Sequence, residues 1–273
     1  MTSTTQAQID LRARYFYLGS AAVLILGFVS SVLLSQLSRP VLIDPGIDNT
    51  YWLMHWLGVP GAVTHSILWA PVLDLVLFFS ALAAAALSPR RTYAIVFSVL
   101  LFIWHITLST YSMHHYHTLV GMLVLSVPFW FGQGERFTFL WEAARYYFFF
   151  MFASAGLWKL TRGAIFDPHQ MAAILKAQHA QYLYDYPDGL FAPLYTYLIS
   201  HAGLSQSLLI SMMLIQLSFL GGFITQRLDR IYLYLFIFFV IINYLVMHIS
   251  SLPLLVFVLV LIDWDRVAQK QSS

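Results

Sequence analysis

The sequence predicts an all-α fold, a polytopic bundle of about eight membrane-spanning helices with amphipathic helices on the extracytoplasmic side. Two features of its composition support this. Of the 273 residues, 60% are hydrophobic and only 10% are charged, whereas soluble domains carry about 25% charged residues. The hydrophobic residues also form runs of roughly 20, the length that crosses the hydrocarbon core of a bilayer. No stretch has a soluble composition for long enough to fold apart, so residues 1–273 are expected to form a single transmembrane domain.

The breaks between hydrophobic runs, at charged residues and at proline or glycine, divide the chain into eight predicted spans. The first 14 residues are polar and precede the first span. The fourth and eighth spans are shorter than the others. The spans are Tyr15–Leu37, Ile67–Ser88, Thr92–Ser112, Thr118–Gly132, Phe139–Leu160, Gln206–Gln226, Ile231–Ile249 and Leu252–Trp264.

The distribution of positive charge predicts that both termini lie in the cytoplasm. With the N-terminus inside, the outer loops keep only Arg39, Arg162 and Lys176, with Lys159 at an outer helix end, which satisfies the positive-inside rule. The cytoplasmic side then holds Arg12, Arg14, Arg90, Arg91, Arg136, Arg227, Arg230, Arg266 and Lys270.

Two predicted extracytoplasmic segments, residues 38–66 and 161–205, are longer than turns. The first contains the aromatic sequence Tyr51-Trp52-Leu53-Met54-His55-Trp56, which suits the headgroup region of a membrane. In the second, Met171, Ile174, Leu175 and Tyr182 recur at helical spacing opposite Gln170, Lys176 and Gln181, which indicates an amphipathic lid.

Composition also excludes several classes of function. The chain has no cysteine, so disulfides, thiolate metal sites and thiol catalysis are absent. Its formal net charge of +2 is small, and the positive residues do not form a stripe, which argues against nucleic-acid binding.

Polar side chains inside the predicted spans need partners or a function, because an ionisable group at the centre of a bilayer costs about 2.5 kcal/mol or more. Asp74 can be a proton relay or a hydrogen-bond acceptor for a neighbouring helix, and both interpretations stay open. Glu142 and Arg145 are three residues apart, a spacing that favours an ion pair on one helix face. Gln216 and Asn243 are typical of interhelical hydrogen bonds.

Several histidines fall near the predicted outer ends of the spans. Any one of them can simply be solvated or satisfied by a neighbour, can serve as an acid or base near neutral pH, or can ligate a metal or haem. No HExxH or CxxCH pattern is present, so we assign no metal. The histidines are His105, His114, His115, His117 and His248.

Lys159 ends the fifth predicted span, where two roles are open. Its ammonium can reach the membrane interface along its flexible stem. Alternatively, the small residues Ala153, Ala155 and Gly156 permit a close helix approach, and desolvation in such a place favours the neutral amine, which can act as a general base.

The segment Tyr147–Leu160, which ends in Ala-Gly-Leu-Trp-Lys-Leu, resembles the signature of the vitamin K-dependent gamma-carboxylase family and its bacterial relatives with a horizontally transferred transmembrane (HTTM) domain. More distantly, its Gly-x-x-Lys-Leu ending is similar to that of DoxX-like membrane proteins. His114 or His115 resembles the histidine of the family's Asn-His-x-Tyr-Leu segment, and His248 that of its late Phe-His segment. Gln216 stands where relatives often carry a glutamate, so this chain lacks that carboxylate.

The resemblance implies a protein of the bacterial cytoplasmic (inner) membrane that binds a quinone or hydroquinone of the menaquinone or vitamin K type in an extracytoplasmic pocket. In the carboxylases, the matching lysine is understood as the base that deprotonates vitamin K hydroquinone and starts its oxygenation. It therefore implies Lys159 as the base, with His114, His115 and His248 as helpers in catalysis. The residues expected to line the cofactor site are His105, His117, Gly156, Trp158 and Gln216. The resemblance implies quinol-linked oxygenation or carboxylation. Whether carboxylation occurs stays open, because the carboxylases hold their protein substrate in a large lumenal domain, whereas this chain stops soon after the last predicted span.

Two other functions stay open. In one, the chain is a non-enzymatic membrane subunit or assembly factor that docks a membrane or extracytoplasmic protein through its outer loops. In the other, Asp74, His105, Gln216 and Asn243 line a path for a small solute or protons, although so few polar residues make a poor pathway.

Overall fold

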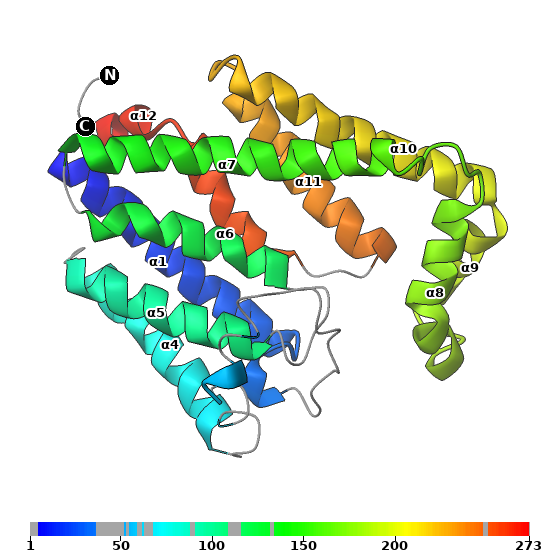
Figure 1. The fold of residues 1–273 in the computed structure, drawn as a ribbon, viewed down its shortest axis with the longest axis horizontal. Helices are drawn as coiled ribbons and strands as arrows, with labels where there is room; N and C mark the ends of the chain where they lie inside the picture. Colours follow the sequence, from blue (N-terminus) through cyan, green and yellow to red (C-terminus); the bar gives the residue numbers. More distant parts are fainter. Residues whose placement is uncertain are drawn as a thin grey trace. The chain divides into compact units, whose positions relative to one another are not determined.

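All regular secondary structure in the described part of the chain is helical, which confirms the predicted all-α class. The computed structural model describes residues 5–36, 52, 55–58, 62, 68–87, 91–108, 116–131, 134–247 and 251–272. The elements, drawn in Figure 1, are α1 (Gln6–Val29), η1 (Leu34–Gln36), α4 (Trp69–Ala86), α5 (Arg91–Leu108), α6 (Tyr116–Ser126), η2 (Val127–Trp130), α7 (Gly134–Thr161), α8 (Gln170–Asp185), α9 (Ala192–Ser200), α10 (Ala202–Ser218), η3 (Phe219–Phe223), α11 (Asp229–Met247), η4 (Leu252–Leu261) and α12 (Trp264–Ser272).

Five helical segments among the described residues are long and apolar enough to cross a membrane. They coincide with the first, second, third, sixth and seventh predicted spans. The segments are Gln6–Gln36, Trp69–Ala86, Arg91–Leu108, Ala202–Phe223 and Asp229–Met247. The chain thus has several helices compatible with an integral membrane protein.

The other three predicted spans take different forms. The fourth contains a shorter apolar helix, Gly121–Trp130, and the eighth is a 3₁₀ segment of 10 residues. The fifth predicted span lies within α7, a helix of 28 residues. Tyrosine, tryptophan and charged residues interrupt its phenylalanines and lower its hydropathy, so that α7 is not among the five segments apolar enough to cross a membrane. The count of eight spans and the cytoplasmic placement of both termini stay predictions.

The chain divides into two compact units, Met1–Ala144 with Leu252–Ser273, and Arg145–Ser251, and the boundary falls within α7. The expected single transmembrane domain stays a prediction. In the first unit, α1 packs against α4, α4 against α5, and α6 against η4 (Figure 1). Its core is aromatic, because the fully buried rings of Phe16 and Tyr17 on α1 meet Phe97 on α5 and Phe129 in η2 at centroid distances of 5.3–5.9 Å.

Arg12 links three segments of the first unit. The Cζ atom of Arg12 lies 5.2 Å from the ring centroid of Trp141, and 5.8 Å from those of Phe137 and Trp264. A guanidinium over aromatic faces is attracted by the ring quadrupoles. This cluster therefore joins α1 to α12 and to the first turns of α7.

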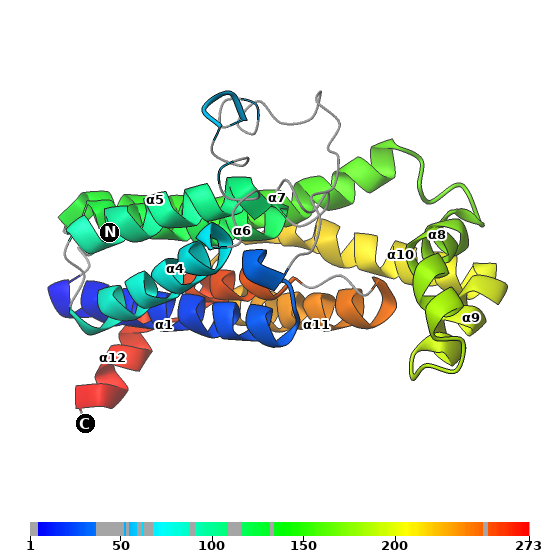
Figure 2. The same cartoon turned by 90° about the horizontal axis from the view of Figure 1, so that it is seen from below.

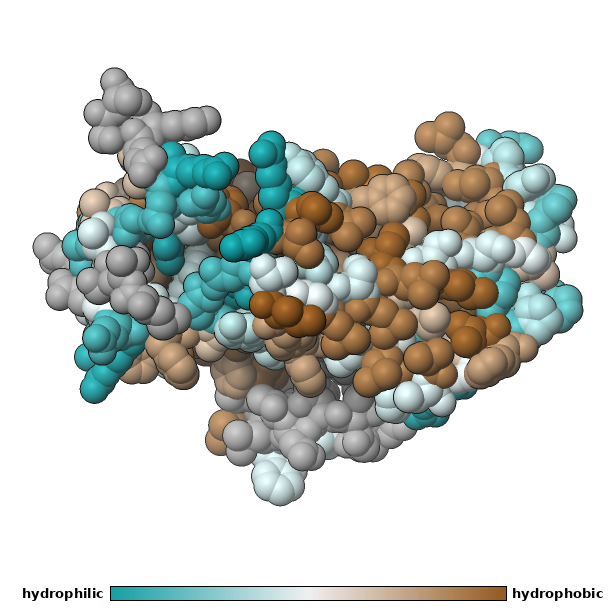
Figure 3. All heavy atoms as spheres, turned by 90° about the horizontal axis from the view of Figure 1, so that it is seen from above, coloured by the Kyte–Doolittle hydropathy of each residue, from teal (hydrophilic) through white to brown (hydrophobic). Residues whose placement is uncertain are grey.

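The second unit is built around phenylalanine rings from α7, η3 and α11. Phe152 stacks on Phe219 at 5.0 Å, and Phe148 meets Phe236 edge-on at 5.2 Å. These four side chains are at most 5% exposed. Figure 3 shows hydrophobic surface over much of the visible face, and the exposed side of α11 contributes Ile231, Tyr234, Phe238 and Ile241 to the surface of the second unit.

A buried ion pair crosses the second unit. Arg145 on α7 donates from Nε and Nη2 to the two carboxylate oxygens of Asp229 on α11, at 2.8 and 2.6 Å. Its Nη2 also donates to the carbonyl oxygens of Gly222 and Thr225. The structure thus pairs Arg145 with a carboxylate on another helix. The three-residue spacing had favoured Glu142, on the same helix, as the partner.

The segment 161–205 forms a helical pair, α8 and α9, which lie side by side (Figures 1 and 2). As predicted for an amphipathic helix, Met171 and Leu175 are buried while Lys176 is exposed, although Ile174 is 36% exposed. The buried ring of His179 stacks on Tyr195 at 3.6 Å, and its Nε2 lies 2.8 Å from the carbonyl oxygen of Val246 on α11. Burial raises the pKa of Tyr195, so that its phenol stays neutral in this stack.

Candidate functional site at Lys159 and Gln216

Lys159 lies in the last turn of α7 and reaches α10. Its Nζ donates a hydrogen bond of 2.6 Å to Oε1 of Gln216, a residue 57 positions later in the chain. Gln216 is 4% exposed and Lys159 is half-buried. Lys159 therefore has a specific polar partner, which solvent-facing snorkelling alone does not provide.

Gly156 allows α7 and α10 to approach each other closely next to Lys159. It lies three residues before Lys159, and so on the same face of α7. A Cβ atom placed on Gly156 would lie 3.0 Å from Cβ of Gln216 and 3.0 Å from the backbone nitrogen of Leu217. Any larger residue at position 156 would push α10 away from α7, so the glycine sets the distance at which Lys159 meets Gln216.

The partner of Lys159 is an amide and not a carboxylate, and this affects which protonation state the site favours. A glutamate at position 216 would attract the ammonium by a full Coulombic interaction in a poorly solvated place. The neutral amide lacks that attraction, yet it still accepts a hydrogen bond from either the ammonium or the neutral amine. The arrangement can therefore hold Lys159 in position without fixing its proton.

Trp158, the next residue of the predicted site, lies on an exposed part of α7. Its side chain is 60% exposed, and the Cζ atom of Arg162 lies 4.2 Å from its ring centroid. An aromatic ring and a guanidinium therefore pair on the surface at the end of α7.

The predicted histidine helpers are not placed at this site by the structure. His114, His115 and His248 lie outside the described residues, and His117 is described only as part of the α6 backbone. His105 is 8% exposed on α5 and belongs to the first unit, whereas Lys159 belongs to the second. The convergence of histidines on Lys159 stays a prediction.

Asn243 and Asp74, two other polar residues singled out in the predicted spans, have nearby partners. Nδ2 of Asn243 lies 3.4 Å from Oγ of Ser251. Asp74 accepts from Nε1 of Trp104 on α5 at 2.5 Å, which confirms that it is an acceptor for a neighbouring helix. Among the described residues, no three histidine, aspartate or glutamate side chains gather closely enough to hold a metal ion.

The sequence already links Gly156 to Lys159, and the resemblance places Gln216 in the same expected site, but neither predicts the hydrogen bond between Lys159 and Gln216. The spacing of Gly156 and Lys159 on one helix face was a usable signal that a partner helix approaches there. Nothing in the sequence indicates that the helix packed at Gly156 is the one that carries Gln216, and not one with another of the later polar residues.

Comparisons with models of protein families, with curated proteins and with solved structures find no match to this chain.

Proposed function

We propose that this chain is a bacterial inner-membrane protein that binds a quinone or hydroquinone beside Lys159, with Lys159 as the base that takes a proton from the quinol. The observation that carries the proposal is the hydrogen bond between Nζ of Lys159 and Oε1 of Gln216. The likeness of the Tyr147–Leu160 segment to the carboxylase and HTTM signature supports the choice of a quinol as ligand.

The chemistry of the proposed step is a single proton transfer. The neutral amine of Lys159 accepts the hydroxyl proton of the quinol and becomes an ammonium, and the quinol becomes its anion. The amide group of Gln216 keeps the amine oriented during the transfer, because its oxygen accepts a hydrogen bond from the amine before and after. The quinol anion then adds dioxygen at a ring carbon. The electron pair of the anion forms the new carbon–oxygen bond, and the dioxygen is reduced to a peroxide anion on the ring, which is the first step of a quinol-linked oxygenation.

A second candidate function is a non-enzymatic membrane subunit that docks a protein partner through its outer loops. Exposed side chains around the turn between α8 and α9 favour it, because Tyr184 and Leu190 are each 87% exposed. Exposed aromatic and apolar groups of this kind are typical of contacts with another protein or with the membrane interface. In this function Lys159 and Gln216 only hold α7 against α10.

Substitution of Gln216 distinguishes the two functions. In Gln216→Glu the new carboxylate holds Lys159 as an ammonium, so quinol-dependent oxygen uptake is expected to fall by about tenfold or more. The measurement is oxygen consumption by the purified protein in nanodiscs supplied with a reduced naphthoquinone.

Gln216→Met is the matched control, because it keeps the size of the side chain and adds no charge. It is expected to keep more of the activity than Gln216→Glu. Equal activity in the parent and Gln216→Glu would contradict a base at Lys159, and no oxygen uptake or quinol binding in the parent would favour the docking subunit.

A further inference from the structure

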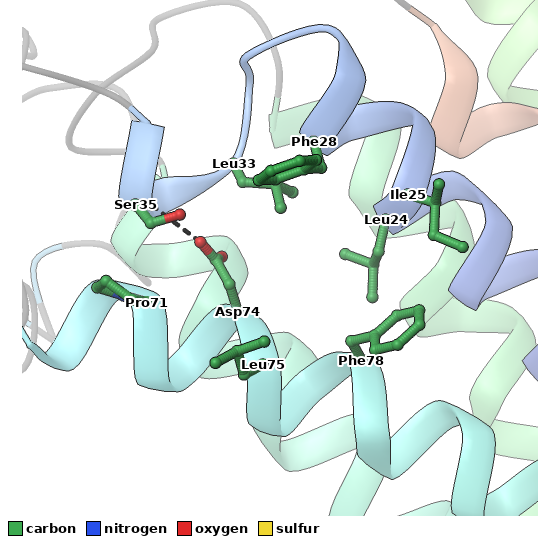
Figure 4. A pocket seen from close by; sticks show the side chains of 9 residues that line it. All are labelled: Leu24, Ile25, Phe28, Leu33, Ser35, Pro71, Asp74, Leu75 and Phe78. Atoms are coloured by element: carbon green, nitrogen blue, oxygen red, sulfur yellow. Dashed lines mark hydrogen bonds between the residues drawn. The ribbon is translucent and has the colours of Figure 1, made fainter.

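A cavity of about 340 Å³ opens between α1 and α4 in the first unit. Figure 4 shows its lining, which is apolar except for Asp74 on α4 and Ser35 in η1. The other lining residues are Leu24, Ile25, Phe28, Leu33, Pro71, Leu75 and Phe78. Its volume falls at the lower end of the roughly 300–1,000 Å³ of small-molecule sites.

Asp74 brings a carboxylate to the wall of this apolar cavity while being only 6% exposed. One oxygen accepts from Nε1 of Trp104 at 2.5 Å, and the other accepts from the backbone nitrogen of Ser35 at 2.9 Å. An ionised carboxylate has about four acceptor positions, so these two bonds leave capacity on both oxygens.

Both donors to Asp74 are neutral, so its charge is not balanced by them. The ion pair of Arg145 with Asp229 and that of Arg266 with Asp263, all four of them described residues, do not include Asp74. Asp74 lies in a segment that is apolar and long enough to cross a membrane. A carboxylate there is costly without a cationic partner, and a positively charged ligand would supply one.

The lining determines which cation fits. Hard metal cations require several oxygen ligands, whereas the cavity wall offers a single carboxylate among hydrocarbon side chains. An ammonium on an apolar chain or ring can instead pair with Asp74 while its hydrocarbon part contacts Leu24 and Leu33. The rings of Phe28 and Phe78 add aromatic surface that attracts cations.

The position of the cavity allows entry from the side. Ile25, Phe28 and Leu75 line it and are also 52%, 61% and 56% exposed, so the cavity wall continues onto the outer surfaces of α1 and α4. Both helices belong to segments able to cross a membrane. A ligand dissolved in the bilayer can therefore reach the cavity without passing through water.

We infer that this cavity binds a lipophilic organic cation, an ammonium group carried on a hydrocarbon body, with Asp74 as its counter-ion. The site uses residues of the first unit only and does not depend on the quinol function of Lys159.

The test measures binding to the full chain in phosphatidylcholine nanodiscs, with empty nanodiscs as the baseline for partitioning into lipid. Tritiated dodecylamine is the probe, and dodecanol and dodecanoate are chain-matched competitors. The parent is expected to bind dodecylamine saturably and at least about tenfold more tightly than dodecanol, with dodecanoate weakest, because only the ammonium forms a charge-assisted hydrogen bond with the carboxylate of Asp74.

Two variants separate the charge from the cavity. Asp74→Asn is expected to lose about tenfold in dodecylamine affinity and to leave dodecanol affinity unchanged. Leu75→Trp fills the cavity and is expected to abolish saturable binding of dodecylamine. Equal affinities of the parent for amine and alcohol, or full dodecylamine binding by Leu75→Trp, would overturn the inference even where Asp74→Asn fails to fold.

Discussion

Replacement of Arg145 with alanine is expected to lower the free energy of unfolding by about 3–5 kcal/mol, because it leaves a buried charge without its partner. Both oxygens of Asp229 accept from the guanidinium of Arg145, whose side chain is 3% exposed, against 15% for Asp229. The carbonyl oxygens of Gly222 and Thr225 lose a donor in the same substitution. The guanidinium also covers the ring of Phe149, with Cζ 4.6 Å from the ring centroid. Chemical unfolding of the detergent-solubilised protein, followed by tryptophan fluorescence, measures the change.

Arg266→Ala is the control for this prediction. Arg266 pairs with Asp263 at 2.9 Å, but the two side chains are 78% and 55% exposed, so the loss is expected to be at most about 1 kcal/mol. A double variant, Arg145→Met with Asp229→Leu, is expected to recover much of the stability, since apolar residues often replace buried ion pairs without loss. If Arg145→Ala and Arg266→Ala destabilise equally, the buried pair does not hold α7 to α11.

Lys159→Met is expected to lower quinol-dependent oxygen uptake by about 100-fold or more, the usual contribution of a general base. Methionine keeps the unbranched stem but cannot accept a proton. Because the hydrocarbon part of the contact with α10 remains, quinol binding is expected to change much less than turnover. Oxygen consumption and binding of a reduced naphthoquinone are measured on the same nanodisc preparations.

Lys176→Met removes an amine of the same type from the exposed surface of α8. Its oxygen uptake is expected to match that of the parent. A loss of activity in Lys176→Met as large as in Lys159→Met would mean that general surface charge, and not a base beside Gln216, supports the reaction.

The helices could be predicted from the sequence because their cause is local. Long runs of apolar residues give spans wherever they occur, and five of the eight predicted spans coincide with helices able to cross a membrane. For the fifth predicted span, a run of hydrophobic residues did not give a helix apolar enough to cross a membrane. Hydrophobic phenylalanines mark it, but the tyrosines, tryptophans and charges between them lower its hydropathy, and much of its aromatic surface packs on η3 and α11.

The partners of the buried polar residues could not be predicted, because they are far away in the sequence. The helical three-residue rule favoured Glu142 for Arg145, whereas the structure pairs Arg145 with Asp229, 84 residues later. For Asp74 the sequence left two interpretations open, a proton relay and an acceptor for a neighbouring helix. The structure shows that it accepts from Trp104, a residue that gave no signal of that role. Lys159 and Gln216 are likewise 57 residues apart in the sequence, and the close packing of α7 and α10 at Gly156 brings them within hydrogen-bond distance.

Photoaffinity labelling tests most directly whether a quinol binds beside Lys159. An azido-naphthoquinone is reduced, bound to the protein in nanodiscs and activated by light, and the labelled peptides are identified by mass spectrometry with and without excess unlabelled quinol. The proposed function predicts competed labels at the end of α7 around Trp158 and Lys159 and on α10 around Gln216. Labels spread evenly over the lipid-facing helices, or labels that excess quinol does not displace, would contradict it.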